Sequence, residues 1–364
     1  MYNLPELFFQ LLNHGTSHIS FSISACSLFV KLRPKQTNKF TLDFALRIPY
    51  TEISILMQGE VHMEHRYYCG WDGGGTKTEV LCVNEAGQVI GNQSFGPINI
   101  NGATRERVRQ SVRDSVAFMS TMPGGLEACA GLAIGAAGAS NKEISSLITE
   151  TIREGGYNGP LLIKGDQDIA LAGAVDGAGA VLVAGTGSVC CGQDGKGGYA
   201  RTGGCGYLID DEGGGYAIGR DILAAAVRAE DKRIPPTLLT GMLKETMGFE
   251  NNRDIVTWVY SPNTNKKEVA ALAPLMLKAM EQGDEAATQI ALKAARELAE
   301  LVKGVWRALD LQEGELAFVG SILLKCDLIN REVTRLCEEA CEGLKVIKAH
   351  GTPAQGAVKL AQGL

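Results

Sequence analysis

The amino-acid sequence predicts an α/β fold built from two similar domains, and three observations lead to this prediction. From Tyr67 onwards, short apolar runs alternate with stretches whose apolar residues recur every three to four positions, as in strands alternating with helices. An apolar strand, a glycine-rich loop and a second strand begin at residue 67 and recur in residues 180–200, about 110 residues later. The chain has 364 residues, which is enough for two domains with separate cores.

The first predicted domain opens with a buried strand at residues 67–72. Two further strands are expected on either side of the turn-forming sequence NEAG. A helix follows, in which Val108, Val112, Val116 and Met119 have helical spacing. The expected bounds in the remainder of this domain, these elements included, are strands at 78–83, 88–95, 128–138 and 160–164, and helices at 103–120, 141–154 and 167–175.

The second predicted domain repeats the opening hairpin and then has a long helical region, roughly residues 214–308. Pro353 is well placed to begin the last helix, because proline is tolerated in the first turn. Strands are expected at 315–319 and 344–348, with a helix at 328–342 between them. The expected division is an N-terminal domain at 63–178, a C-terminal domain with a helical insertion at 179–350, and a closing helix at 351–364 that packs back on the first domain.

Residues 1–62 differ in composition from the remainder. They contain two of the 45 glycines but six of the ten phenylalanines. Our hypothesis is that they form a non-native or disordered extension created by a wrongly assigned start, with Met63 as the true first residue. Codons for Gln58–Glu60 can read as a ribosome-binding sequence just before Met63. The alternative is a genuine N-terminal docking segment, and the intact mass of protein made from the native gene separates the two.

Composition and cysteine spacing exclude several classes of protein. The net charge of −6 argues against broad nucleic-acid binding, which usually needs a basic surface. The ten cysteines include no CxxC pair, so neither a zinc nor an iron–sulfur spacing is visible. No apolar stretch is long enough for a membrane span. We therefore expect a cytoplasmic protein with no membrane or nucleic-acid partner.

The first glycine loop is suited to phosphate. Gly73, Gly74 and Gly75 allow close approach of the backbone to a ligand, and successive N–H groups form an anion cradle. Thr76 adds a hydroxyl and Lys77 a positive charge. Asp72 alone would repel phosphate, but it fits if Mg²⁺ lies between the carboxylate and the phosphate, directly or through water.

The second glycine loop offers a similar cradle, consisting of Gly185, Thr186, Gly187 and Ser188. Two such loops at the starts of two similar units are able to clamp a polyphosphate. The P-loop pattern GxxxxGK[ST] is absent, and the first loop leads into a strand rather than a helix, unlike a Rossmann fingerprint. A tight turn remains the ordinary alternative for either loop taken alone.

Five motifs give residues 66–364 a clear family resemblance. The chain resembles the N-acetylglucosamine kinases of the BadF/BadG/BcrA/BcrD ATPase family, within the actin-like sugar-kinase superfamily. The motifs are DGGGTKTE (72–79), VLVAGTGSVCCG (181–192), GGCGYLIDDEGGGYAIGRD (203–221), FVGSILL (318–324) and GTPAQGAVKLA (351–361). The resemblance implies a duplicated actin-like (ribonuclease H-like) fold with a cleft between domains. It also implies use of ATP with Mg²⁺ and phosphorylation of the 6-hydroxyl of an amino sugar.

The resemblance also implies a role for Asp166, in the sequence KGDQDIALAGA (164–174). An aspartate at this place would contact the sugar, orient the attacking hydroxyl and accept its proton late in the transfer. The ordinary alternative is a helix N-cap. Asp166 and Asp168 look equally suited to capping from sequence, and the motif register favours Asp166 as the base.

Further site residues follow from the resemblance. Asn99, Gly204 and Asp211 would bind the sugar, with Asn101 as the other register for the asparagine. Gly320 and Ser321 would line the adenosine side. Cys205 and Asp210 depart from the family pattern, which has tryptophan and glycine there, so the substrate is left open among N-acetylglucosamine, N-acetylmuramic acid and glucosamine, as in cell-wall sugar salvage.

Two other classes remain open. The first is an ATPase that activates a 2-hydroxyacyl-CoA dehydratase-type partner, which would need cysteines for a shared iron–sulfur cluster. The second is a sugar sensor without catalysis. A homodimer is expected because dimers are common among proteins that the chain resembles.

Overall fold

The structure is a computed structural model, and it describes residues 66–99, 103–136, 138–139 and 141–364, together with the backbone of four strands nearer the N-terminus. The chain divides into two compact units, residues 1–65 and 66–364. In the first unit the strands form an antiparallel sheet of order β1-β2-β3-β4. They are β1 (His18–Ile23), β2 (Cys26–Pro34), β3 (Phe40–Ile48) and β4 (Thr51–Gly59). The other residues before Arg66 lie outside the described part, and the hypothesis about residues 1–62 stays a prediction.

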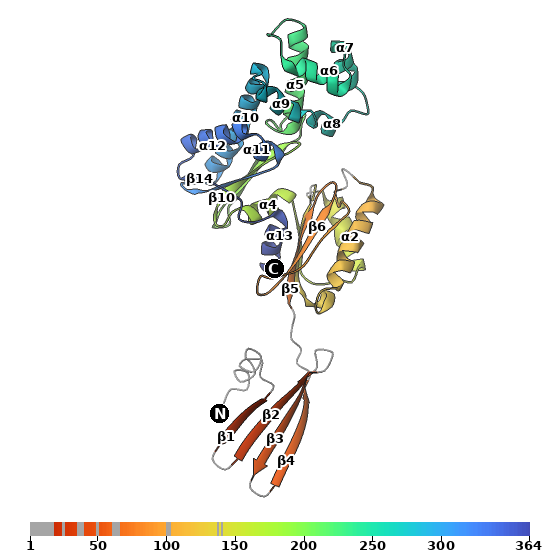
Figure 1. The fold of residues 1–364 in the computed structure, drawn as a ribbon, viewed down its shortest axis with the longest axis vertical. Coiled ribbons are helices and arrows are strands. Elements are labelled where there is room, and N and C mark those ends of the chain that lie inside the picture. The colour runs from red at the N-terminus through yellow and green to blue at the C-terminus, as the bar shows by residue number, and fades with distance from the viewer. Residues whose placement is uncertain are drawn as a thin grey trace. The chain divides into compact units, whose positions relative to one another are not determined.

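Two five-stranded sheets with the same strand order form the second unit (Figure 1). In each sheet the first three strands pair antiparallel in chain order, and two further strands pair parallel on the other side of the first strand. The predicted duplicated α/β fold is therefore confirmed. The first sheet, of order β7-β6-β5-β8-β9, contains β5 (Tyr67–Gly73), β6 (Thr78–Asn84), β7 (Val89–Phe95), β8 (Cys129–Ala136) and β9 (Leu161–Lys164). The second, of order β12-β11-β10-β13-β14, contains β10 (Ala178–Ala184), β11 (Ser188–Asp194), β12 (Tyr199–Gly203), β13 (Gly314–Val319) and β14 (Leu344–Ile347).

Helices cover both faces of the first sheet. On one face, Tyr67, Cys69 and Trp71 of β5 are fully buried against α2 (Arg105–Ser120) and α3 (Lys142–Glu154). On the other face, Tyr68 and residues of β6 pack against α13 (Pro353–Gln362), which also contacts β8. Figure 1 shows α2 and α13 on opposite sides of β5 and β6. Alternation of the strand side chains thus fixes which helix lies on which face.

Helix α4 (Asp166–Ala174) contacts both sheets. It contacts β5 and β8 of the first sheet and β10 and β11 of the second, and it packs closely on α13. Ala170 and Leu171 are buried with Val181 and Cys191 of the second sheet. The opposite face of that sheet, including Leu182, is buried under the helices of the insertion. Residues of α4 are therefore positioned by both halves of the unit.

The structure adds detail that the sequence did not predict. The glycine-rich turn after β11 leads into a third strand, β12, which completes the match to β7. A short helix, α11 (Ser321–Lys325), precedes α12 (Asp327–Ala340). The long helical region consists of α5 (Gly215–Glu230), α6 (Leu238–Met247), α7 (Asn252–Val259), α8 (Lys266–Ala270), α9 (Ala273–Glu281) and α10 (Glu285–Leu309).

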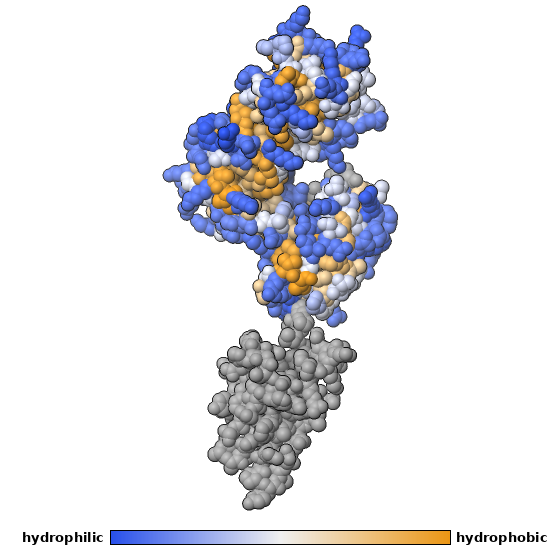
Figure 2. Space-filling model, viewed as in Figure 1, coloured by the Kyte–Doolittle hydropathy of each residue, from blue (hydrophilic) through white to orange (hydrophobic). Residues whose placement is uncertain are grey.

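The face of the second unit seen in Figure 2 is mainly polar. Figure 2 shows hydrophilic residues over most of the visible face, with apolar residues in separate patches. Among the helices in the described part of the chain, none has the length and apolar character needed to cross a bilayer.

Candidate functional site

The first glycine loop closes the hairpin between β5 and β6. Asp72 lies opposite Glu79, and Gly73 lies opposite Thr78. The loop is tightened by a hydrogen bond from the N–H of Gly74 to the carbonyl of Lys77 at 2.9 Å. The buried hydroxyl of Thr78 donates to the carbonyl of Gly96 at 2.7 Å. The predicted phosphate loop is therefore a turn held on a buried strand end, with Thr76 and Lys77 exposed at its tip.

Asp72 is a partly buried carboxyl group at this loop, with Asp166, Glu79 and Lys77 as its charged neighbours. Burial raises the pKa of its carboxyl group, and the charges of Asp166 and Glu79 raise the pKa further, while Lys77 lowers it. A carboxylate in such surroundings is stabilised by a cation. Mg²⁺ prefers oxygen ligands and is commonly held by one or two carboxylates together with substrate phosphates. The residues present therefore fit the predicted metal position beside the loop.

Asn99 lies beside the same loop. A Cβ atom added to Gly75 would lie 3.9 Å from the Nδ2 atom of Asn99. The predicted sugar-binding asparagine is thus next to the predicted phosphate cradle. The alternative residue, number 101, lies outside the described residues.

The second glycine loop is fixed against the start of α5. Its Gly185 N–H donates to the carbonyl of Gly187 at 2.9 Å. The N–H of Gly215 donates to the carbonyl of Gly185 at 2.8 Å, and the N–H of Tyr216 donates to the carbonyl of Thr186 at 2.9 Å. These bonds join the loop to the first turn of a long helix, so its conformation is set by α5.

Ser188, the last residue of this second loop, and Asp211, which contacts the loop at Gly187, are both buried. The hydroxyl of Ser188 is buried and donates to the carbonyl of Glu212 at 2.6 Å. Asp211 is 8% exposed and has a φ of 60°, a left-handed conformation that aspartate tolerates better than most residues. Its carboxylate occupies the space that a side chain at Gly187 would need. Burial raises the pKa of Asp211, and the neighbouring Asp210 raises it further.

Asp166 is the first residue of α4. Its Oδ1 atom accepts the N–H of Gln167 at 3.1 Å. The side chain reaches solvent. Partial burial raises the pKa of its carboxyl group, and the charge of Asp168 raises the pKa further. Backbone N–H groups and the charge of Arg201 lower the pKa and so oppose this shift. Since Asp166 also raises the pKa of Asp72, the predicted base and the predicted phosphate hairpin are electrostatic neighbours.

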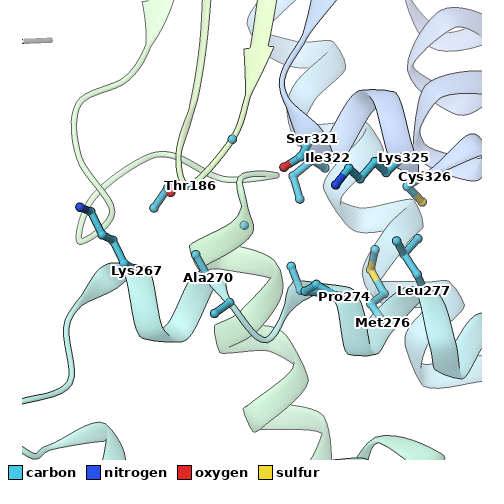
Figure 3. Close-up of a pocket in the computed structure, with 14 residues that line it drawn as sticks. Thr186, Lys267, Ala270, Pro274, Met276, Leu277, Ser321, Ile322, Lys325 and Cys326 are labelled. Atoms are coloured by element: carbon cyan, nitrogen blue, oxygen red, sulfur yellow. The ribbon is translucent and has the colours of Figure 1, made fainter. Parts of the chain in front are cut away.

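A pocket of about 300 Å³ adjoins the second loop. Figure 3 shows Thr186 on the loop at one side of the pocket and apolar side chains of α8, α9 and α11 around the remainder. Gly320, with a φ of 101°, lies so close to the carbonyl of Ala184 that no side chain fits there. The labelled lining residues are Thr186, Lys267 and Ala270 (α8), Pro274, Met276 and Leu277 (α9), Ser321, Ile322 and Lys325 (α11), and Cys326.

The predicted sugar segment (203–221) begins at the end of β12, continues as a glycine-rich loop and enters α5. The guanidinium group of Arg201 donates to the carbonyl of Gly204 at 2.8 Å. The N–H of Cys205 donates to the carboxylate of Asp210 at 3.0 Å. The two departures from the family pattern therefore contact each other, and Asp210 stabilises a turn that exposes the Cys205 thiol.

The structure brings the predicted residues into two groups. Asp72, Asn99 and Asp166 lie near the first loop, whereas Thr186, Ser188, Asp211 and Ser321 lie around the second. Sequence reasoning missed Arg201, Lys267 and Lys325. Lys267 lies in a helix without a recognisable motif. Lys325 directly follows the motif FVGSILL (318–324), and Arg201 lies two residues before the predicted sugar segment, so the sequence offered a signal for both.

Comparison with known proteins identifies the class to which this fold and these loops belong. The sequence profile described as the BadF/BadG/BcrA/BcrD ATPase family matches residues 69–361, so the chain is a member of that family. It is 33% identical over 301 residues to an N-acetylmuramic acid/N-acetylglucosamine kinase of Clostridium acetobutylicum, covering 82% of this chain and 98% of that protein. It is 27% identical over 318 residues to an N-acetyl-D-glucosamine kinase of Dictyostelium discoideum, with the same coverage of both.

Solved structures share the fold. A protein described as a candidate N-acetylglucosamine kinase from Chromobacterium violaceum superposes with a TM-score of 0.65 at 24% identity, over 82% of this chain and 100% of that one. A similarly described protein from Porphyromonas gingivalis gives a TM-score of 0.60 at 20% identity, over 81% and 97%. These similarities establish the two-sheet α/β architecture.

Proposed function

We propose that this protein is an ATP-dependent amino-sugar kinase that transfers the γ-phosphate to the 6-hydroxyl of N-acetylglucosamine or a close relative, N-acetylmuramic acid or glucosamine. The observation that carries the proposal is the position of Asp166. It begins a helix that contacts both sheets, and its charge acts on Asp72 at the phosphate hairpin. The names of the Clostridium and Dictyostelium relatives favour the same activity.

Asp166 orients the sugar hydroxyl and accepts its proton. Phosphoryl transfer has a loose transition state, so positioning contributes more than early proton removal. The raised pKa makes Asp166 a better proton acceptor than an ordinary aspartate, and its exposure leaves the carboxylate accessible to a substrate. Asn99 beside the first loop, Gly204 in the glycine-rich loop and Asp211 next to the second loop bind the remainder of the sugar.

The two glycine loops hold the phosphates. The first loop, Gly73–Lys77, supplies backbone N–H groups, a hydroxyl and an ammonium group to one side of the phosphates. The second loop, Gly185–Ser188, contacts the phosphates from the other side. Asp72 would hold Mg²⁺, directly or through water, and the ion would supply positive charge beside the transferred phosphate. The 300 Å³ pocket takes the nucleoside, with apolar side chains against the base and Ser321 at its edge.

A pair of substitutions tests the assignment of the base. Asp166→Asn is expected to reduce turnover by about 100-fold or more while the Kd for ATP changes little. Asp168→Asn, the matched control two residues away, should retain most of the turnover. Steady-state ADP release and equilibrium ATP binding measure both. Equal activity of Asp166→Asn and the wild type would show that another group is the base.

The other classes have less support. An ATPase activator with a shared cluster needs accessible cysteines, and Cys205 alone is exposed among the cysteines that the structure describes.

Three further proposals concern the organisation of the protein. They are a division into domains at 63–178 and 179–350 with a closing helix at 351–364, a cytoplasmic location, and a homodimer. Light scattering on the purified protein tests the dimer, and partial proteolysis tests the domain boundaries.

A further inference from the structure

Arg201 lies on the face of the second sheet that packs against α4. It pairs with Cys191 across the antiparallel ladder between β12 and β11, and directly opposite residues point to the same face. Cys191 is fully buried with Ala170 and Leu171 of α4. The strand register therefore directs the Arg201 side chain to the side of the sheet that carries α4.

The guanidinium group of Arg201 also fixes the sugar loop. It donates to the carbonyl of Gly204 at 2.8 Å. A Cβ atom at Gly204, which has a φ of 70°, would lie 2.5 Å from the same nitrogen. Gly204 is thus shaped to receive the arginine, and the turn that begins the predicted sugar segment depends on it.

The charge of Arg201 acts on Asp166. It lowers the pKa of that carboxyl, against the effect of burial and of Asp168. In the part of the chain that the structure describes, no carboxylate forms an ion pair with Arg201 within 4.0 Å. The guanidinium group therefore has donors available beyond its bond to Gly204.

We propose that Arg201 is a positioning residue for phosphoryl transfer, which joins the sugar-binding turn at Gly204 to the α4 terminus that carries Asp166. This inference rests on the proposed kinase function. The positive charge lies on the α4 side of the sheet, where it favours the ionised form of the Asp166 carboxyl, and the bond to Gly204 holds the turn that begins the sugar segment. Holding this charge and this turn together affects the orientation of the reacting hydroxyl, to which transfer rates are sensitive.

The test separates charge from hydrogen bonding. Arg201→Gln keeps a donor for the Gly204 carbonyl and removes the charge, while Arg201→Lys keeps the charge. Lys196→Gln is the matched control, because it removes a positive charge from the exposed turn of the same hairpin. For each variant, kcat and both KM values are measured with N-acetylglucosamine and with N-acetylmuramic acid.

We expect Arg201→Gln to lower kcat by about 10- to 100-fold with both sugars, with the KM for ATP unchanged. Arg201→Lys should restore most of the turnover, and Lys196→Gln should match the wild type. If Arg201→Gln does not fold, Arg201→Met is compared with Arg201→Lys in its place. The inference is overturned if the lysine variant has no higher turnover than the methionine variant.

Three further results would overturn the inference. The first is wild-type kcat in Arg201→Gln. The second is a loss confined to N-acetylmuramic acid, because Arg201 would then bind the carboxylate of that substrate. The third is a wild-type enzyme whose ADP release is independent of sugar, which would also remove the proposed function. In the first two cases the kinase assignment stands, so the two failures are distinguishable.

Discussion

The carboxylate of Asp168 accepts the backbone N–H of Gly165 at 2.9 Å, and this bond caps the N-terminus of α4. Asp166, two residues earlier, bonds instead to the N–H of the next residue. The capping contact that the sequence could assign to either aspartate is therefore made by Asp168. Asp166 keeps its second carboxylate oxygen available for a substrate.

Replacing the cap should affect stability more than activity. We expect Asp168→Ala to lower the free energy of unfolding by about 1 kcal/mol, the usual cost of losing a helix-terminal acceptor. Asp166→Ala should change it by much less, because its one local bond is to the adjacent N–H. Urea denaturation of both variants measures the difference. A larger loss of stability in Asp166→Ala would contradict this account.

The pH dependence of catalysis should reflect the raised pKa of Asp166. A general base works in its ionised form, so kcat/KM falls as the pH drops through the pKa of the free enzyme. Because burial raises that pKa, the fall should begin above the range of an ordinary aspartate, near 3.9. Initial rates from about pH 4 to pH 8 test this. A flat profile down to about pH 4 would contradict it.

The same shift has a consequence for stability. The folded state holds the Asp166 proton more strongly than the unfolded state does. Its contribution to stability is therefore present at low pH and is lost as the pH rises from the ordinary value to the raised one. In Asp166→Asn this decline should disappear, which the free energies of unfolding of both proteins at several pH values would reveal.

The order of strands and helices was predictable because each element has its own local pattern. Val108, Val112 and Val116 are all buried on one side of α2, as their spacing predicted. Strand β12 was missed because Tyr199–Gly203 has no apolar alternation and follows a glycine-rich turn. A strand at a sheet edge needs less apolar sequence than a central one, so its signal is weak.

Close packing of α13 on α4 depends on Gly356. A Cβ atom there would collide with the carbonyl of Ile169 and with the backbone of Gly173. We expect Gly356→Ala to destabilise the fold by about 1–3 kcal/mol. Gly241→Ala, on the exposed side of α6 with no atom within 4 Å, should stabilise by about 0.5–1 kcal/mol. Thermal unfolding of both variants gives the comparison, and shifts of the same sign would argue against this packing.

Filling the 300 Å³ pocket should weaken nucleotide binding. Ala270 lines it, so we expect Ala270→Leu to raise the KM for ATP about tenfold or more and to leave the KM for the sugar nearly unchanged. Ala286→Leu makes the same change in a separate cavity of about 440 Å³ and serves as the control. Equal KM values for ATP in the wild type and Ala270→Leu would place the nucleoside elsewhere.

Part of the site could not be predicted because its contacts join residues that are distant or unremarkable in the sequence. Lys267 and Lys325 are 58 positions apart, yet they line one pocket. Cys205 and Asp210 were recognised as separate departures from a family pattern, but the hydrogen bond between them is visible only in the folded loop. Sequence motifs locate the two glycine-rich hairpin loops, whereas the environment of Asp166 depends on the packing of α4 against both sheets.

The measurement that tests the central claim most directly is ADP release with Mg²⁺ and ATP across a panel of sugars. The panel contains N-acetylglucosamine, glucosamine, N-acetylmuramic acid, N-acetylmannosamine, glucose and a sample without sugar. The account predicts release that depends on an amino sugar, with a sugar 6-phosphate as the second product. Release at the same rate without sugar, or no release with any of them, would contradict it.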